Sequence, residues 1–236
     1  MDSQRHPPPE SGSGAPAGPQ IGARDWEYEA WEGLFYPEDL PGEWRLAYYA
    51  NEFRCVLVSA DRLGQADPAD VRGWLAEVPD DFAFLAEVTL PAGERPRDPG
   101  GDWLGRLEPF GERLEGVLVR WPAAPESGAR LERLVRRLAA RYTVWLEPPP
   151  ASEAAPEWVA DSGAGWVWPG PDAGNRPAVL ALVGPGQSGR RKLGELLQQV
   201  LTAAGPPGRA YVIVEGDPPA MEVLQDAETI LQLLGA

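Results

Sequence analysis

The sequence predicts an α/β fold, a TIM-type (β/α)8 barrel that is shortened around its fifth and sixth crossovers. Eight short runs rich in β-branched or aromatic residues alternate along the chain with longer amphipathic segments. Parallel strands need crossover connections of this length, and these are usually helices. Eight such strands close most readily into a ring, and the 236 residues of the chain fit the roughly 250 that this barrel typically needs.

The strands are predicted from the apolar runs and the helices from the apolar spacing between those runs. We expect strands at residues 20–23, 55–59, 82–88, 116–120, 142–146, 165–168, 178–183 and 210–214. We expect helices at residues 41–51, 68–78, 103–114, 129–140, 190–204 and 218–234. Two of these helices start at a proline that follows Asp, at Pro68 and Pro218, which is typical of a helix start.

Two crossovers and the N-terminus depart from this regular alternation. Residues 154–160 allow barely two helical turns, and residues 169–177 contain too much Pro and Gly for a helix. Residues 1–19 are mainly Pro, Gly and Ser, so they cannot bury enough apolar surface to offset the entropy lost on ordering. We therefore expect a disordered tail at residues 1–19 and a single barrel domain at residues 20–236.

The charge of the chain argues against nucleic acid as a partner. The formal net charge is −15, so the average surface would repel a phosphate backbone. The dense basic run has helical spacing, and we favour a solvated helix face for it over a phosphate-binding patch. Its members are Arg130, Arg133, Arg136, Arg137 and Arg141.

The inventory of reactive side chains excludes several chemistries. Cys55 is the one cysteine, which rules out an internal disulfide and fits a reducing compartment. His6 is the one histidine and lies in the tail, so a Ser-His-Asp triad and an ordinary zinc site are excluded. Lys192 opens a predicted helix beside arginines, which does not favour Schiff-base chemistry. No stretch is long enough to cross a bilayer, and we expect a cytoplasmic protein without a membrane partner.

Six carboxylates follow predicted strands and can meet at the mouth of the barrel. They are Asp25, Asp61, Glu87, Glu147, Glu215 and Asp217. Converging carboxylates can bind a hard cation such as Mg²⁺, or can act as an acid and a base. Alternatively they are solvated loop charges paired with Arg24, Arg62 and Arg120, and we favour this interpretation because loop acids are plentiful in an acidic chain.

Two further segments are candidate binding elements. The sequence GPGQSGR follows a predicted strand and precedes a helix, where backbone N–H groups can hold an anion. Its candidate anion-binding residues are Gly184, Gly186, Ser188, Gly189 and Arg190. The alternative is that these glycines permit a tight turn. The loop after the first strand carries Trp26, Tyr28, Trp31, Phe35 and Tyr36, which could stack on a ligand or pack as a lid over the barrel end, and we favour packing.

The segment IGARDWEYEAWEGLFYPEDL at residues 21–40 resembles the opening of the YecE-like family, also called domain of unknown function 72. The resemblance continues through LAYYANEF, WLAEVPDDFAF, RLEPFGERLEGVLVRWP, RYTVWLE and the final YVIVEGD. It implies a TIM-type barrel over nearly all of residues 20–236, and it implies no established activity.

The polar groups usual in that family at the strand ends are largely replaced in this chain. Ser59, Glu87, Arg120, Trp145 and Glu147 stand where the family's polar residues usually lie on strands two to five. The same holds for Ala181, Val183, Glu215 and Gly216 on the last strands, whereas Asp217 is retained. The first loop therefore matches the family, and the barrel mouth does not.

These observations lead to two hypotheses. The first is a diverged or non-catalytic barrel, a possible pseudoenzyme, that binds a small molecule or a protein partner at the C-terminal ends of the strands. Its candidate ligand-binding residues are Arg24, Asp25, Trp26, Tyr28, Trp31, Tyr36, Asp61, Arg62 and Arg120. It includes neither a metal nor a cofactor. The alternative is a carboxylate-based hydrolase or lyase, possibly with Mg²⁺, acting on a phosphorylated or sugar-like substrate. Its candidate catalytic residues are Glu87, Glu147, Glu215 and Asp217.

Overall fold

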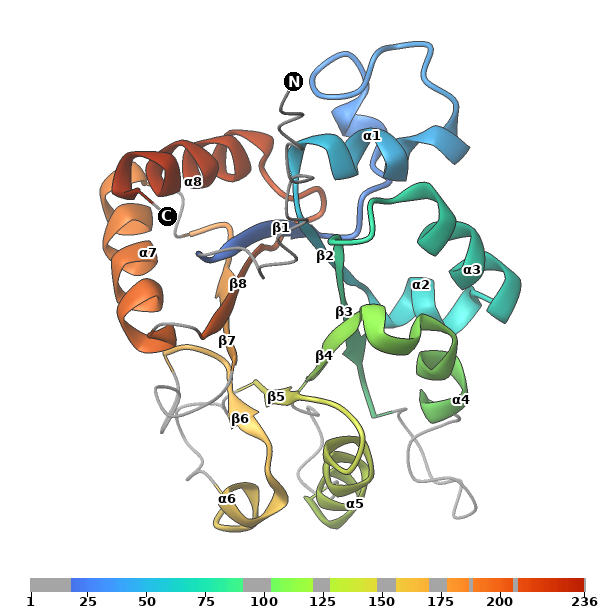
Figure 1. Ribbon diagram of the computed structural model, residues 1–236, viewed down its shortest axis with the longest axis vertical. Coiled ribbons are helices and arrows are strands. Elements are labelled where there is room, and N and C mark those ends of the chain that lie inside the picture. The colour runs from blue at the N-terminus through green and yellow to red at the C-terminus, as the bar shows by residue number, and fades with distance from the viewer. Residues whose placement is uncertain are drawn as a thin grey trace, which may run out of the picture.

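The computed structural model describes residues 18–90, 103–120, 128–147, 156–169, 178–186, 189–205 and 208–235. Within these residues, eight parallel strands form a nearly closed ring, and the helices lie around its outside (Figure 1). The predicted barrel is therefore confirmed. The predicted tail lies outside the described residues up to residue 17, as does most of the sixth crossover, residues 170–177.

The strands are consecutive around the ring, in the order β6-β5-β4-β3-β2-β1-β8-β7. Their bounds are β1 Gln20–Arg24, β2 Cys55–Val58, β3 Ala83–Val88, β4 Leu114–Val119, β5 Val144–Leu146, β6 Gly165–Trp166, β7 Ala178–Val183 and β8 Arg209–Val214. Within the described residues, one bridge joins β6 to β7, where the Trp168 N–H donates to the Leu180 carbonyl at 2.7 Å. This bridge completes the ring.

The helices follow the predicted positions closely. They are α1 Arg45–Glu52, α2 Ala60–Gln65, α3 Pro68–Glu77, α4 Trp103–Leu107, α5 Gly128–Ala139, α6 Trp158–Ser162, α7 Arg190–Ala204 and α8 Met221–Leu234. The helix predicted at residues 103–114 divides into α4 and a 3-10 segment, Glu108–Arg113. It divides because Pro109 lacks an N–H for the helix and Gly111 adopts φ +56°.

Helix α2 is an element that the sequence analysis missed. Ser59, predicted as the end of the second strand, is instead the residue before this helix. Its hydroxyl accepts a hydrogen bond from the Arg62 N–H at 3.2 Å, as expected of a serine that caps a helix. Asp61 and Arg62 therefore lie on the first turn of a short helix.

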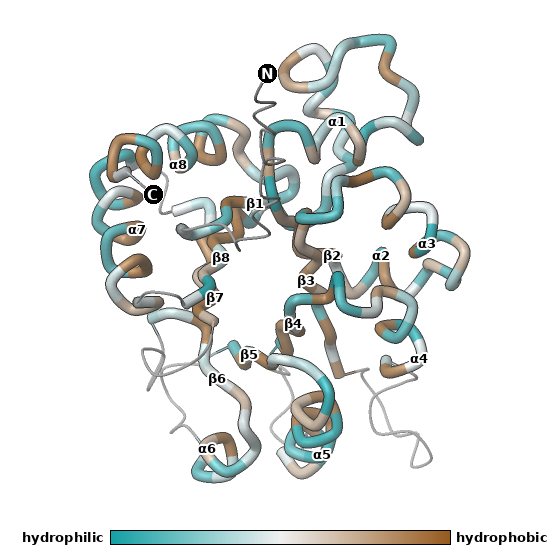
Figure 2. Tube along the Cα trace, viewed as in Figure 1, coloured by the Kyte–Doolittle hydropathy of each residue, from teal (hydrophilic) through white to brown (hydrophobic). Residues whose placement is uncertain are grey.

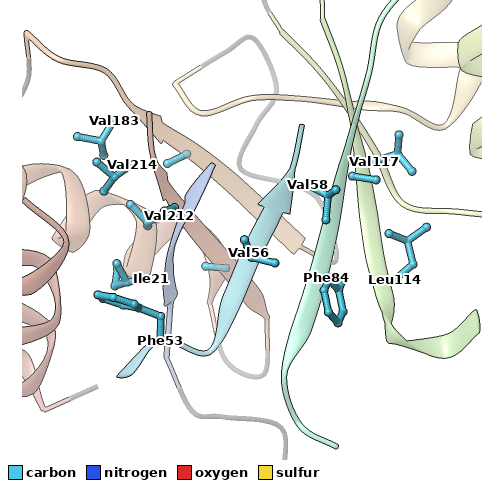
Figure 3. Packing of buried hydrophobic residues seen from close by; sticks show 14 of the residues in the cluster. Ile21, Phe53, Val56, Val58, Phe84, Leu114, Val117, Val183, Val212 and Val214 are labelled. Carbon is cyan, nitrogen blue, oxygen red and sulfur yellow. The ribbon is translucent and has the colours of Figure 1, made fainter. Parts of the chain in front are cut away.

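The core has two parts because successive side chains of a strand point to opposite faces of the sheet. The outer part lies between the ring and the helices, and Figure 3 shows its Val56 and Val58 on β2, its Phe84 on β3 and its Val212 on β8. The inner part fills the ring itself and includes Leu57, Leu85, Leu118, Trp145, Tyr211 and Ile213. Both faces of the strands are thus apolar, and Figure 2 shows hydrophobic segments along strands such as β2, β3 and β8.

The long loop between β1 and α1 is packed as part of the core. Trp31 is 1% exposed, its ring stacks on Tyr49, and its indole N–H donates to the Pro219 carbonyl at 3.0 Å. This bond ties the loop to the segment between β8 and α8. The Tyr36 hydroxyl donates to the Trp26 carbonyl within the same loop. Among the described residues, no helix is both long and apolar enough to span a membrane.

The filling of the ring generates a prediction about Gly116. A Cβ atom added to Gly116 would lie 2.1 Å from the Cζ3 atom of Trp145, whose indole N–H donates to the Ala178 carbonyl at 3.1 Å. We expect Gly116→Ala to lower the free energy of unfolding by about 1–3 kcal/mol, because the buried ring would have to move. Urea denaturation measures this change.

A matched control is Gly73→Ala in α3, where nothing lies within 4 Å of an added Cβ. We expect this substitution to raise the free energy of unfolding by about 0.5–1 kcal/mol, since alanine loses less backbone entropy in a helix. A Gly116→Ala variant as stable as the wild type would contradict a lumen filled by Trp145.

Candidate functional site

The alternation of the strands places five charged side chains in one layer at the C-terminal end of the barrel. Glu87 comes two residues after the inward-facing Leu85, and Arg120, Glu147 and Glu215 follow Leu118, Trp145 and Ile213 by the same step. Arg24 is the last residue of β1 and bonds to this group. We call these five residues the mouth layer: Arg24, Glu87, Arg120, Glu147 and Glu215.

Glu87 is the most deeply buried member of the mouth layer, with a side chain that is 5% exposed. Arg24 donates two hydrogen bonds to its carboxylate, from Nε at 2.9 Å and from Nη2 at 3.1 Å. Arg120 donates to the Oε2 atom of Glu87 at 3.1 Å and 3.3 Å. One carboxylate is therefore held between two guanidinium groups.

Arg120 also connects opposite walls of the ring. Its Nη1 donates to the Glu147 carboxylate at 3.3 Å, and its Nη2 donates to Glu215. Strands β4 and β8, which precede Arg120 and Glu215, lie four places apart in the order of eight strands, on opposite sides of the ring (Figure 1). The guanidinium group of Arg120 therefore lies across the mouth.

These contacts set the charge states of the buried groups. Burial by itself raises the pKa of Glu87, but the hydrogen bonds from Arg24 and the charge of Arg120 outweigh it and leave the pKa below 4.5. The hydrogen bond to Glu87 raises the pKa of Arg24. Burial by itself lowers the pKa of Arg120. The hydrogen bond to Glu215 and the charges of the nearby acids outweigh burial, so the pKa of Arg120 is raised overall. Glu87 is thus an ionised acceptor at neutral pH.

A cleft of about 590 Å³ lies beside the mouth layer. The loop after β1, helices α2 and α3, and the segment after β8 form its walls. It is lined by Arg24, Asp25, Glu27, Tyr28, Ser59, Asp61, Arg62, Gln65, Ala66, Asp70, Trp74 and Asp217. Gln65, Ala66, Asp70 and Trp74 were not expected here, because α2 and the position of α3 beside it could not be predicted from local pattern. Glu27, in the loop after β1, was not expected either.

Arg62 is the central cation of this cleft. Its guanidinium carbon lies 4.4 Å from the ring centroid of Trp26. The guanidinium pairs with Asp25 at 3.3 Å and with Glu27 at 2.9 Å. The guanidinium group of Arg62 therefore contacts one aromatic ring and two carboxylates.

Asp25 has a left-handed backbone, with φ +59°, which is uncommon for a residue with a side chain. Its N–H donates to the Leu57 carbonyl at 2.9 Å, and its carboxylate accepts from the Ser59 N–H at 2.9 Å. These bonds hold the turn at the end of β1 against the start of α2. Asp25 is thus fixed on both sides at the floor of the cleft.

The predicted aromatic residues divide into two groups. Trp26, Trp31 and Tyr36 are at most 3% exposed, so they offer little surface to a ligand. Tyr28 is half-buried, lines the cleft, and donates its hydroxyl to the Arg24 carbonyl at 2.5 Å. Burial raises the pKa of Tyr28, which keeps the phenol neutral.

The predicted anion-binding loop is described only in part, because residues 187–188, and thus Ser188, lie outside the described residues. Gly184, Gly186 and Gly189 are described. Arg190 donates to both carboxylate oxygens of Asp226 on α8, at 2.8 Å and 2.5 Å. None of its described residues lines the cleft.

Of the six predicted carboxylates, three lie in the mouth layer, Glu87, Glu147 and Glu215, and three line the cleft, Asp25, Asp61 and Asp217. Searching only the described part of the chain, no group of three or more His, Cys, Asp or Glu residues has the arrangement that could hold a metal ion. In the mouth layer, guanidinium groups lie between the acids.

Solved structures with the same fold include two from one family. A DUF72 family protein from Thermotoga maritima is 20% identical, with a TM-score of 0.69 over 91% of this chain and 99% of the other. One from Enterococcus faecalis is 17% identical, with a TM-score of 0.69 over 90% and 95% of the two chains. A D-psicose 3-epimerase is 11% identical, with a TM-score of 0.55 over 91% and 97%. At these identities the likeness shows the fold alone.

The sequence comparisons agree with the structural ones. No curated protein sequence matches this chain. The family described as "Protein of unknown function DUF72" matches residues 20–236, which includes every strand described above. The chain therefore belongs to the DUF72 family, the YecE-like family whose opening motif its first loop resembles.

Proposed function

We propose that this DUF72 barrel is a non-catalytic member that binds a small ligand in the cleft beside its mouth. The observation that carries the proposal is the position of Arg120, whose guanidinium group bonds to Glu87, Glu147 and Glu215 across the ring. Barrel enzymes place substrate and catalytic groups at this end of the strands. Here a side chain of the protein takes that place.

The state of the acids also supports a binding role. A general acid needs a raised pKa and a general base needs access to a proton on the substrate. Glu87 has a lowered pKa and its carboxylate accepts four hydrogen bonds from two arginines. Its lone pairs are thus engaged within the chain.

The cleft meets the requirements of a ligand site better than the mouth does. Its volume of about 590 Å³ falls within the usual range for small-molecule pockets. Its floor is fixed by the hydrogen bonds of Asp25, and half-buried aromatic rings, Tyr28 and Trp74, lie among its lining residues. Such rings supply contact area at low entropic cost.

A library assay tests the proposal against a carboxylate-based hydrolase or lyase. The purified chain is incubated with phosphoester and glycoside substrates, with and without Mg²⁺, and is screened in parallel for small-molecule binding by thermal shift. We expect no turnover above background, and stabilisation by at least one ligand class. Turnover that is abolished in Glu87→Gln or Glu215→Gln would overturn the non-catalytic assignment.

The buried ion pairs predict a pH-dependent effect of Glu87→Gln. The variant leaves two half-buried guanidinium groups without the charge that they share, which we expect to cost about 3 kcal/mol of unfolding free energy at pH 7. The folded pKa of Glu87 is lowered, so its stabilising contribution is complete above its unfolded value of about 4.5 and disappears as pH falls through the folded value. The difference between wild type and variant should therefore be constant above about pH 5 and narrow below it in urea titrations.

Arg120→Ala tests whether the guanidinium group holds the mouth together. Removing it leaves Glu87, Glu147 and Glu215 facing one another, and we expect a loss of about 3 kcal/mol in unfolding free energy. The control is Arg136→Ala on α5, an exposed residue paired with Glu132 at 2.9 Å, where we expect a change within about 0.5 kcal/mol. Equal effects of the two substitutions in denaturant melts would refute the bridging role of Arg120.

A further inference from the structure

We infer that copies of this chain associate head to tail, with residues 29–44 of one copy docked on the basic outer face of α5 of the next. The inference goes beyond the ligand-binding proposal, because no residue of either surface is among those that line the described cleft. The first support is an exposed apolar surface within residues 29–44. Leu34 is 67% exposed and Trp44 is 63% exposed. Large apolar side chains in water favour association, and tryptophan is enriched among the residues that contribute most to protein interfaces.

The two exposed side chains belong to one apolar strip. Tyr48 follows Trp44 by one helical turn, so their side chains lie on one side of this helical segment. The ring of Tyr48 meets that of Phe35 edge to face at 5.4 Å, and Phe35 follows Leu34 directly. Tyr48 and Phe35 are half-buried and pack against the core. The strip is therefore supported from below and offers its exposed ends to a partner.

The charge around this strip selects the kind of partner. Residues 29–44 contain five carboxylates and neither lysine nor arginine. All five are exposed, and they are Glu29, Glu32, Glu38, Asp39 and Glu43. Glu32 pairs with Arg45, the residue after the segment, and the segment stays negative overall. A partner surface that fits it must therefore be basic.

Helix α5 presents such a surface. Residues 128–141 contain five arginines and Glu132 as the one acid, in a chain whose formal net charge is −15. Arg133 and Arg137 are exposed and lie four residues apart on one face of α5, and the exposed Arg141 continues this spacing just after the helix end. We call these three arginines the basic face. The apolar residues of α5 are buried, so the basic face is the side that a partner can reach.

Arginine suits a partner that is both aromatic and acidic. Its flat guanidinium group can stack on a ring while it bonds to a carboxylate. The chain already contains this combination, since the guanidinium carbon of Arg62 lies 4.4 Å from the ring centroid of Trp26 while the same group pairs with Glu27 at 2.9 Å. An arginine of the basic face would find the same two partners in the exposed Trp44 and Glu43 of another copy.

The two surfaces cannot meet within one molecule. Residues 29–44 lie beside α1, at the opposite end of the molecule from α5, with the ring of strands between them (Figure 1). Two different surfaces that bind each other between copies make a head-to-tail contact, which continues as an open chain or closes into a ring. Such a contact differs from a two-fold symmetric one, because a copy blocked at residues 29–44 can still bind a copy blocked at α5.

Sedimentation velocity of the full chain tests this inference. We expect the average mass to rise with protein concentration in about 50 mM NaCl and to return to that of a monomer in about 500 mM NaCl, since salt screens exposed charges. The loop variant Leu34→Ser/Trp44→Ser and the helix variant Arg133→Glu/Arg141→Glu should each stay monomeric. Because each variant keeps one intact surface, an equimolar mixture of the two should form a heterodimer and nothing larger.

The matched controls are Leu233→Ser/Leu234→Ser on α8 and Arg191→Glu/Lys192→Glu on α7, which change exposed residues outside both surfaces. We expect both controls to associate as the wild type does, and an equal loss of association in them would overturn the inference. A wild-type chain that stays monomeric at low salt, or a mixture of the two variants without a heterodimer, would overturn it as well. If such a monomeric chain bound a labelled oligonucleotide and the helix variant did not, the basic face would be assigned to a phosphate backbone instead.

Discussion

The upper end of the barrel depends on one requirement, that charges turned toward the axis of a closed ring must be neutralised by other groups of the ring. Below Glu87, Arg120 and Glu215 the inward side chains are apolar and fill the lumen. At the level of these three residues the inward side chains are charged. Loss of hydration would make an unpaired carboxylate or guanidinium group unfavourable there. Arg120 meets this requirement because its fork reaches acids on three strands. A point-charge lysine could not make these directed contacts together.

Much of the fold could be predicted because the signal is local. A strand buried on both faces is a short apolar run, and all eight such runs became strands of the ring. Helix α2 was missed because its six residues carry too little periodicity, and Ser59 reads equally well as a strand end. The division after Leu107 depends on Pro109, which the sequence shows, and on the backbone of Gly111, which composition alone does not fix.

The site was predictable in its membership more than in its arrangement. The strand ends indicated Glu87, Glu147 and Glu215. Each follows an inward-facing apolar residue by two positions, which places it inside the ring, whereas Asp25, Asp61 and Asp217 line the cleft. The pairing with Arg24, Arg62 and Arg120 was also expected, but the acids were expected to be solvated, and the Glu87 side chain is 5% exposed. The roles of Glu27 and Trp74 were not, since Trp74 reaches the cleft only because α3 packs beside the loop after β1. Such a contact is set by tertiary packing between segments about fifty residues apart.

The junction between β6 and β7, which we call the seam, is held in the described residues by the single bridge at Trp168 and is the least extensive strand pairing of the barrel. Strand β6 has two residues and β5 has three, whereas β7 and β8 pair along six residues. Loss of the Trp168 bridge would convert the ring into a curled open sheet whose other strand pairs stay intact. The Arg120 network, which joins β3, β4, β5 and β8, spans from one side of that seam to the other. The Arg120 network therefore resists separation of β6 from β7, so the ion pairs at the mouth also help to keep the barrel closed.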